Sequence, residues 1–143
     1  MSRLNGYTKK QVIGIYEKMV ISRKLDDKML VMLKQGKSFF HIGASGHEAA
    51  QLAAAVLIRP GEDWSYPYYR DGAYCLGLGM TAREQLLSFL AKADDPNSGG
   101  RQMPQHYGHK KLRIVSQSSP TGTQFLQAVG CALARKMSKT NCS

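Results

Sequence analysis

The chain has 143 residues, of which 43% are hydrophobic and 21% are charged, a composition that suits one globular domain with a hydrophobic core and excludes a disordered chain. No apolar run approaches the roughly 20 residues that cross a bilayer, and the first six residues lack the apolar core of a secretory signal, so we expect a cytoplasmic protein without a membrane anchor. The formal net charge of +10 allows an anionic partner, but the Lys and Arg residues are dispersed rather than clustered as in nucleic-acid-binding domains.

The first expected helix begins after Thr8 and ends before Gly36. Thr8 and Gln11 have the spacing of a capping box, and Gly36 offers a left-handed stop. Between them, apolar residues recur about every three or four positions, which predicts one amphipathic helix of about seven turns. These apolar residues are Val12, Tyr16, Met19, Val20, Met29, Leu30 and Leu33.

An alanine-rich helix is expected next, after a connector over residues 37–45 with two exposed or pocket-lining aromatic side chains. The helix begins at residues 46–48 and is ended by Arg59-Pro60-Gly61. His47 and Glu48 are expected to cap its entry. We expect this helix to be buried, because its alanines let another backbone approach closely and three larger residues fill the core. The alanines are Ala49, Ala50, Ala53, Ala54 and Ala55, and the larger residues are Leu52, Val56 and Leu57.

Three more helices are expected, over residues 71–79, 81–92 and 124–137. The second has the capping-box residues Thr81 and Glu84, and Ser119-Pro120 is expected to cap the third, whose apolar face lacks a partner. Residues 93–111 contain too many Gly and Pro residues for regular structure, and residues 114–115 form a short extended piece. No set of strands able to form a sheet is apparent.

The histidines and cysteines do not form a recognisable metal site. Four residues after His47 the second ligand of a zinc-protease motif is replaced by Gln51, and His106 and His109 lack a nearby third ligand, although a loop histidine can contact an anion. The three cysteines are odd in number and far apart, so we expect reduced and mostly buried thiols at Cys75, Cys131 and Cys142.

Tyr69 and Arg70 are candidate ligands for a diphosphate. A guanidinium presents a planar fork of donors that fits two phosphate oxygens, and a phenol adds an uncharged donor. The alternative is a surface cation resting on an aromatic ring. A second polar cluster spans residues 118–124, whose hydroxyl and carbonyl groups suit a hard cation. Spacing alone favours a helix cap for this second cluster.

Four motifs occur in an order that resembles the amino-terminal part of the alpha subunit of thiamine diphosphate-dependent 2-oxo acid dehydrogenases. They are GHEAAQ (46–51), YYRDG (68–72), GRQMPQHYG (100–108) and SSPTGTQFLQAVG (118–130), and the match covers residues 16–136. The resemblance implies an α/β thiamine diphosphate-binding fold of which this chain is the mostly helical amino-terminal part. The loop at residues 100–106 resembles the branched-chain version rather than the pyruvate version.

The resemblance also implies roles for individual residues. Tyr69 and Arg70 would bind the cofactor diphosphate, and Ser119 and Thr121 would contact its aminopyrimidine ring. Phe40, or Phe39 if the alignment shifts by one residue, would lie near the acyl chain of the substrate. The potassium ligands would be Ser118, Pro120, Thr123 and Gln124.

The implied function is oxidative decarboxylation of a 2-oxo acid, with a branched-chain acid favoured and pyruvate next, and acyl transfer to a lipoyl group. The implied partners are a beta subunit or fused beta domain, in a heterotetramer, and a lipoyl acyltransferase core. The family's magnesium motif would follow residue 139, so we expect residues 1–143 to be the amino-terminal portion of a single cofactor-binding domain, inactive alone. The alternatives are a nucleic-acid-binding module, which we do not expect, and a non-catalytic structural protein.

Overall fold

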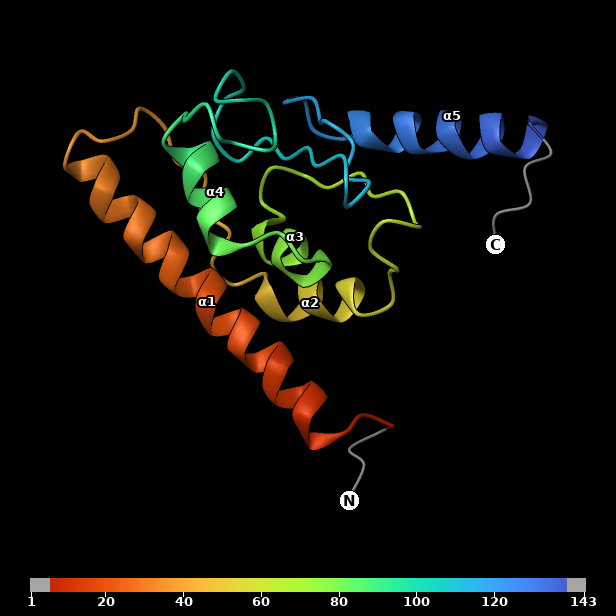
Figure 1. The fold of residues 1–143 in the computed structure, drawn as a ribbon, viewed down its shortest axis with the longest axis horizontal. Coiled ribbons are helices and arrows are strands. Elements are labelled where there is room, and N and C mark those ends of the chain that lie inside the picture. The colour runs from red at the N-terminus through yellow and green to blue at the C-terminus, as the bar shows by residue number, and fades with distance from the viewer. Residues whose placement is uncertain (1–5, 139–143) are drawn as a thin grey trace.

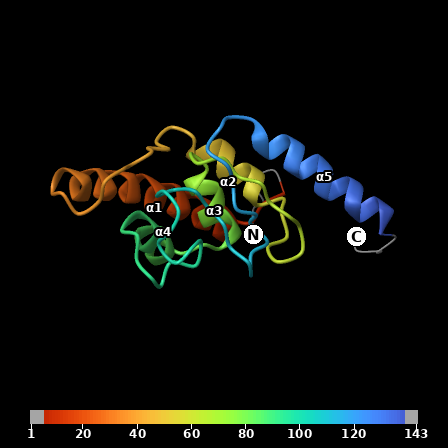
Figure 2. The ribbon, with the colours of Figure 1, turned by 90° about the horizontal axis from the view of Figure 1, so that it is seen from above.

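The computed structural model describes residues 6–138, and these form five α-helices joined by long irregular segments (Figure 1). The helices are α1 (Lys9–Lys34), α2 (Glu48–Ala55), α3 (Gly72–Leu78), α4 (Ala82–Phe89) and α5 (Thr123–Met137). α1 packs against α2, α3 and α4, and α2 packs against α3. α5 extends away from this cluster in both views (Figures 1 and 2). The predictions on Cys142 and on the magnesium motif lie outside the described residues.

α1 begins and ends as the sequence predicts. The Thr8 side chain accepts from the Gln11 backbone at 3.3 Å, and the Gln11 side chain accepts from the Thr8 backbone at 2.9 Å. Gly36 follows the helix with a φ of +70°. The predicted apolar face is only partly buried, because the short helices cover one stripe of this long helix. Met29 is 2% exposed, whereas Tyr16 is 64% exposed.

α2 is shorter and less buried than expected. It ends at Ala55, well before Pro60, and only the stripe formed by Glu48, Gln51, Leu52 and Ala55 is buried. The other four alanines, Val56 and Leu57 are exposed, so the expectation of a buried helix is wrong for most of its surface. A helix of two turns can present only one side to α1 and α3. His47 occupies the N-cap position without making a side-chain capping bond.

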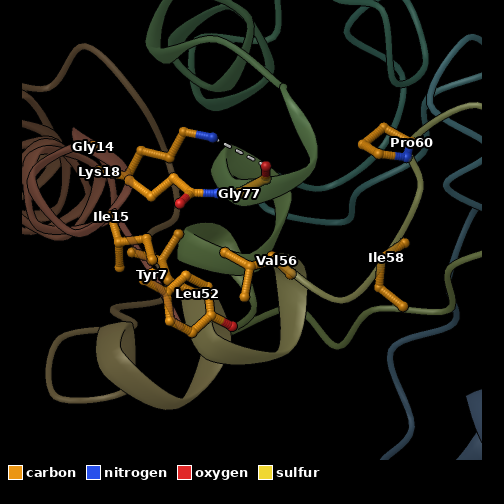
Figure 3. A pocket seen from close by; sticks show the side chains of 11 residues that line it. Tyr7, Gly14, Ile15, Lys18, Leu52, Val56, Ile58, Pro60 and Gly77 are labelled. Carbon is orange, nitrogen blue, oxygen red and sulfur yellow. Dashed lines mark hydrogen bonds between the residues drawn. The ribbon is translucent and has the colours of Figure 1, made fainter. Parts of the chain in front are cut away.

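α3 is the central helix, and five of its seven residues are buried. It contributes Cys75 and Leu78 to one hydrophobic cluster and Leu76 to another that includes Phe89 of α4. At Gly77 it approaches α2 so closely that a Cβ there would lie 2.3 Å from the Ala55 Cβ. Figure 3 shows this junction with α1, where Lys18 Nζ donates to the Gly77 carbonyl at 3.1 Å beside a cavity of about 410 Å³.

α4 has the expected capping box between Thr81 and Glu84, but it ends at Phe89 rather than continuing to residue 92. Ala91 then has a φ of +49°, which a helix cannot accommodate. The irregular segment that follows contains no helix, as predicted. Residues 6–138 contain no β-strand, and isolated bridges join Ile114 to Ser65 and to His109, so the expected absence of a sheet is confirmed for this part.

α5 is not capped by Ser119-Pro120, and that prediction is wrong. Its N-cap is Gly122, with a φ of +90° and no side-chain capping bond, because the Ser119 hydroxyl is engaged elsewhere. The prediction of an apolar face that lacks a partner is confirmed within residues 6–138, since no residue of α5 is buried and Leu126 is 79% exposed. None of the helices in residues 6–138 combines the length and apolar character that a membrane span requires.

Candidate functional site

A cavity of about 330 Å³ brings together side chains from four separate segments. The connector between α1 and α2, the turn before α3, the long irregular segment and the turn before α5 each contribute to its wall. The lining residues are Phe40, Ile42, Tyr69, Arg70, Met103, His106 and Ser119. Four of the residues singled out from the sequence, Phe40, Tyr69, Arg70 and Ser119, therefore share one site. Phe39 is 99% exposed and does not line it.

Arg70 is an exposed cation at the edge of this cavity. Its Nη1 donates to the Gly43 carbonyl at 2.7 Å, and its guanidinium carbon lies 5.6 Å from the centroid of the Tyr69 ring. The structure thus contains the cation–aromatic contact that was the alternative interpretation of this pair. It also places the guanidinium on the cavity wall, where the donors not used by Gly43 can face an anion.

The Tyr69 phenol belongs to a small hydroxyl network. The Tyr68 and Tyr69 hydroxyls share a hydrogen bond, and the Tyr68 hydroxyl lies 3.2 Å from Thr121 Oγ1. The hydrogen bond with Tyr68 raises the pKa of Tyr69. The network places Thr121 beside the Tyr69 segment, although Thr121 itself does not line the cavity.

His106 is a site residue that the sequence analysis considered only as a loop histidine. The residue is 6% exposed, with Nε2 2.6 Å from Ser119 Oγ and Nδ1 3.2 Å from the Pro104 carbonyl. It also lies beside Tyr69, with the ring centroids 5.9 Å apart. The feature of the sequence that could have identified His106 as a site residue is its position within the motif that spans residues 100–108.

The connector that carries Phe40 is fixed by residues that the sequence did not reveal. The buried Gln105 amide forms hydrogen bonds with both the N–H and the carbonyl of Ile42. Asp26 of α1 accepts from the Ala44 backbone at 2.7 Å and from Ser45 Oγ at 2.9 Å. The wall of the site is therefore held by contacts between distant parts of the chain.

The turn that carries Tyr69 and Arg70 is fixed by Asp71 and Gln51. Asp71 accepts from the Tyr68 backbone at 2.8 Å and from Gln51 Nε2 at 3.1 Å, and burial raises the pKa of this carboxyl group. Gln51, which stands where a zinc-protease motif would have its second histidine, also donates to the Arg70 carbonyl at 3.0 Å. In residues 6–138 no group of three or more His, Cys, Asp or Glu side chains is placed to hold a metal.

The predicted potassium ligands lie in the segment before and within the first turn of α5. Thr123 Oγ1 donates to the Pro120 carbonyl at 3.0 Å, which brings two of the four predicted ligand groups together. Ser118 and Gln124 are half-buried. The assignment of these residues to a potassium ion stays a prediction. Cys75 is buried and Cys131 is half-buried, and both are free thiols.

Residues 16–142 match the family model described as dehydrogenase E1 component. The chain is 48% identical over 134 residues to the 2-oxoisovalerate dehydrogenase subunit alpha of Bacillus subtilis, an alignment that covers 94% of this chain and 41% of the relative. It is 33% identical to the mitochondrial subunit alpha 1 of that name in Arabidopsis thaliana and 32% identical to the human mitochondrial subunit alpha, covering 28% and 29% of those relatives. The chain thus spans 41% or less of the length of these three relatives.

Proposed function

The chain belongs to the dehydrogenase E1 component family, and on this premise we propose that it supplies part of the thiamine diphosphate site of a branched-chain 2-oxo acid dehydrogenase. The observation that carries the proposal is the cavity that joins Phe40, Tyr69, Arg70 and Ser119 from four segments. The family is thiamine diphosphate-dependent. The names of the relatives favour a branched-chain 2-oxo acid over pyruvate as the substrate.

The residues of the cavity fit a cofactor of this kind. The Arg70 guanidinium and the Tyr69 phenol are donors suited to a diphosphate. Phe40, Ile42 and Met103 form an apolar wall, as expected for an organic ligand. The volume of about 330 Å³ lies within the range of small-molecule sites, roughly 300–1,000 Å³.

The side chains have distinct tasks in this proposal. When bound, the cofactor supplies the carbanion and the electron sink that decarboxylation of a 2-oxo acid requires. Arg70 holds and orients the diphosphate, and Tyr69 donates to it without adding charge. Phe40 contacts the acyl chain and excludes water. Ser119 and Thr121 contact the aminopyrimidine ring, and residues 118–124 bind potassium.

The other parts of the enzyme lie outside this chain in the proposal. The chain is the amino-terminal portion of one α/β cofactor-binding domain, and the magnesium ligands are in the remainder of that domain. The proposed partners are a beta subunit, in a heterotetramer, and a lipoyl acyltransferase that receives the acyl group. The exposed apolar face of α5 supports the presence of such a covering part. We propose that residues 1–143 alone have no turnover and that the enzyme is cytoplasmic.

Replacement of Arg70 tests the proposal. In the assembled enzyme, Arg70→Ala is expected to raise the apparent dissociation constant for thiamine diphosphate on the order of 10- to 100-fold, because a charge-assisted bond to phosphate is lost. Titration of the apoenzyme with cofactor measures this. The matched control is Arg83→Ala, an exposed arginine of α4 outside the cavity, which should leave the affinity unchanged. An unchanged affinity in Arg70→Ala would show that this arginine is only a surface cation.

A further inference from the structure

Every second residue from Gln117 to Thr121, in the segment before α5, forms a hydrogen bond with another part of the site. With the Gln117 amide oxygen turned toward the Tyr69 backbone N–H, it accepts a hydrogen bond from that N–H at 3.0 Å. Ser119 Oγ lies 2.6 Å from His106 Nε2, and Thr121 Oγ1 lies 3.2 Å from the Tyr68 hydroxyl. Residues 117, 119 and 121 therefore all face the rest of the site. The bond between Ser119 and His106 involves a buried histidine, which is 6% exposed.

The surroundings of His106 determine which atom donates in this bond. Nδ1 faces the Pro104 carbonyl at 3.2 Å, and a carbonyl oxygen can only accept, so Nδ1 carries the proton. In the neutral imidazole, Nε2 then has a free lone pair. In this tautomer the Ser119 hydroxyl donates to Nε2, and this bond orients the hydroxyl. A single histidine thus joins the turn at Pro104 to the segment that carries Ser119.

From this geometry we propose that His106 is a positioning residue that holds Ser119, and with it residues 117–122, at the wall of the cofactor cavity. The inference rests on the proposed function, in which Arg70 binds the diphosphate end of the cofactor and the Ser119 segment contacts its ring. His106 therefore acts mainly on the ring end, and it reaches the diphosphate end only through its ring contact with Tyr69. Its loss weakens binding of the whole cofactor more than binding of a bare diphosphate.

Two substitutions separate the hydrogen bond from general packing. In His106→Asn the amide can replace Nδ1 toward Pro104 but is too short to reach Ser119. In His106→Gln the longer side chain can place its amide oxygen where Nε2 lies and accept from Ser119. We expect His106→Asn to weaken thiamine diphosphate binding by roughly three- to tenfold, the loss of one hydrogen bond, and His106→Gln to restore most of it.

The measurement is equilibrium binding of two probes to the assembled enzyme, thiamine diphosphate and inorganic diphosphate. His106→Asn should weaken binding of thiamine diphosphate more than binding of inorganic diphosphate, whereas Arg70→Ala should weaken both. If His106→Asn weakens both probes equally, the site has merely collapsed and the positioning role is wrong. If His106→Asn leaves the affinity for both probes unchanged while Arg70→Ala weakens the affinity for both, the inference fails and the proposed function stands. If Arg70→Ala also leaves the affinity for both probes unchanged, the proposed function itself fails.

Ser119→Ala provides an independent variant that removes the same bond from its other side. It should cause a similar loss of thiamine diphosphate affinity, and the double variant with His106→Asn should be little worse than either single variant, because both remove one interaction. Losses that add in the double variant would show that the two residues act separately and would overturn the proposal.

Discussion

The Glu48 carboxylate is buried at the start of α2, 5% exposed, and is neutralised by a residue of another helix. Arg23 of α1 donates to it through Nε at 2.7 Å, and the Gly46 backbone donates to its other oxygen at 2.9 Å. The hydrogen bond from Arg23 is the main reason that the pKa of Glu48 lies below its ordinary value. A residue expected only to cap a helix therefore also joins α1 to α2.

This ion pair makes a pH-dependent contribution to stability. Because the pKa of Glu48 is lowered by folding, the charge stabilises the protein above the ordinary value of 4.5, and the contribution is lost as the pH falls through the folded-state pKa. We expect Glu48→Gln to be less stable than the wild type at pH 7 and the difference to shrink below about pH 4.5. Urea denaturation of both proteins from pH 7 to pH 3.5 measures it. A difference that does not change with pH would contradict this account.

At the scale of elements, α2 and α3 approach each other where glycine allows it. Gly77→Ala should lower the free energy of unfolding by about 1–3 kcal/mol, because the new methyl group would overlap Ala55 at 2.3 Å and the helices must separate. Chemical denaturation gives the value. Gly14→Ala is the matched control, since Gly14 lies within α1 with nothing within 4 Å of the added Cβ. It should stabilise the protein by about 0.5–1 kcal/mol, and equal effects at the two sites would refute the close approach.

The boundaries of the elements were predictable where a local signal sets them. The two capping boxes at Thr8 and Thr81 and the left-handed Gly36 depend only on neighbours in the sequence, and all three predictions are confirmed. The cap of α5 was missed because Ser119 bonds His106, 13 positions away, instead of the helix. The buried extent of α2 was overestimated because burial depends on which side faces α1 and α3, which composition does not reveal.

The candidate site shows the same division. Tyr69 and Arg70 were identified by their donor chemistry, and Phe40 and Ser119 by resemblance, and all four line one cavity. The residues that hold the walls in place were missed, because their contacts join distant positions. Gln105 bonds Ile42 from 63 positions away, and no periodicity or motif indicates such a pair.

At the scale of the whole molecule, the hydrophobic core forms without α5, and none of the residues of α5 is buried. In residues 1–143 alone, Leu133→Ser should leave the free energy of unfolding nearly unchanged, because Leu133 is already 56% exposed. Leu52→Ala, at a side chain 1% exposed, should cost about 2–5 kcal/mol in the same denaturation experiment. In the proposed assembly with a beta subunit, the effect of Leu133→Ser should appear as weaker assembly. A large loss of stability in the isolated chain would mean that α5 already has a partner within it.

The net charge of the whole chain predicts only weak contact with nucleic acids. The charge of +10 is dispersed, so we expect binding to oligonucleotides that is weak, independent of sequence and abolished by moderate salt. Fluorescence titration with single- and double-stranded oligonucleotides at two salt concentrations measures this. Tight binding that persists at physiological salt would favour a nucleic-acid-binding module instead.

We propose that the cavity lined by Phe40, Tyr69, Arg70 and Ser119 is a thiamine diphosphate site. An experimental structure of the assembled enzyme with this cofactor tests it most directly. We expect the diphosphate within hydrogen-bonding distance, about 3 Å, of the Tyr69 hydroxyl and the Arg70 guanidinium, with the ring against residues 119–121. A cofactor bound elsewhere, with Arg70 directed into solvent, would contradict the account.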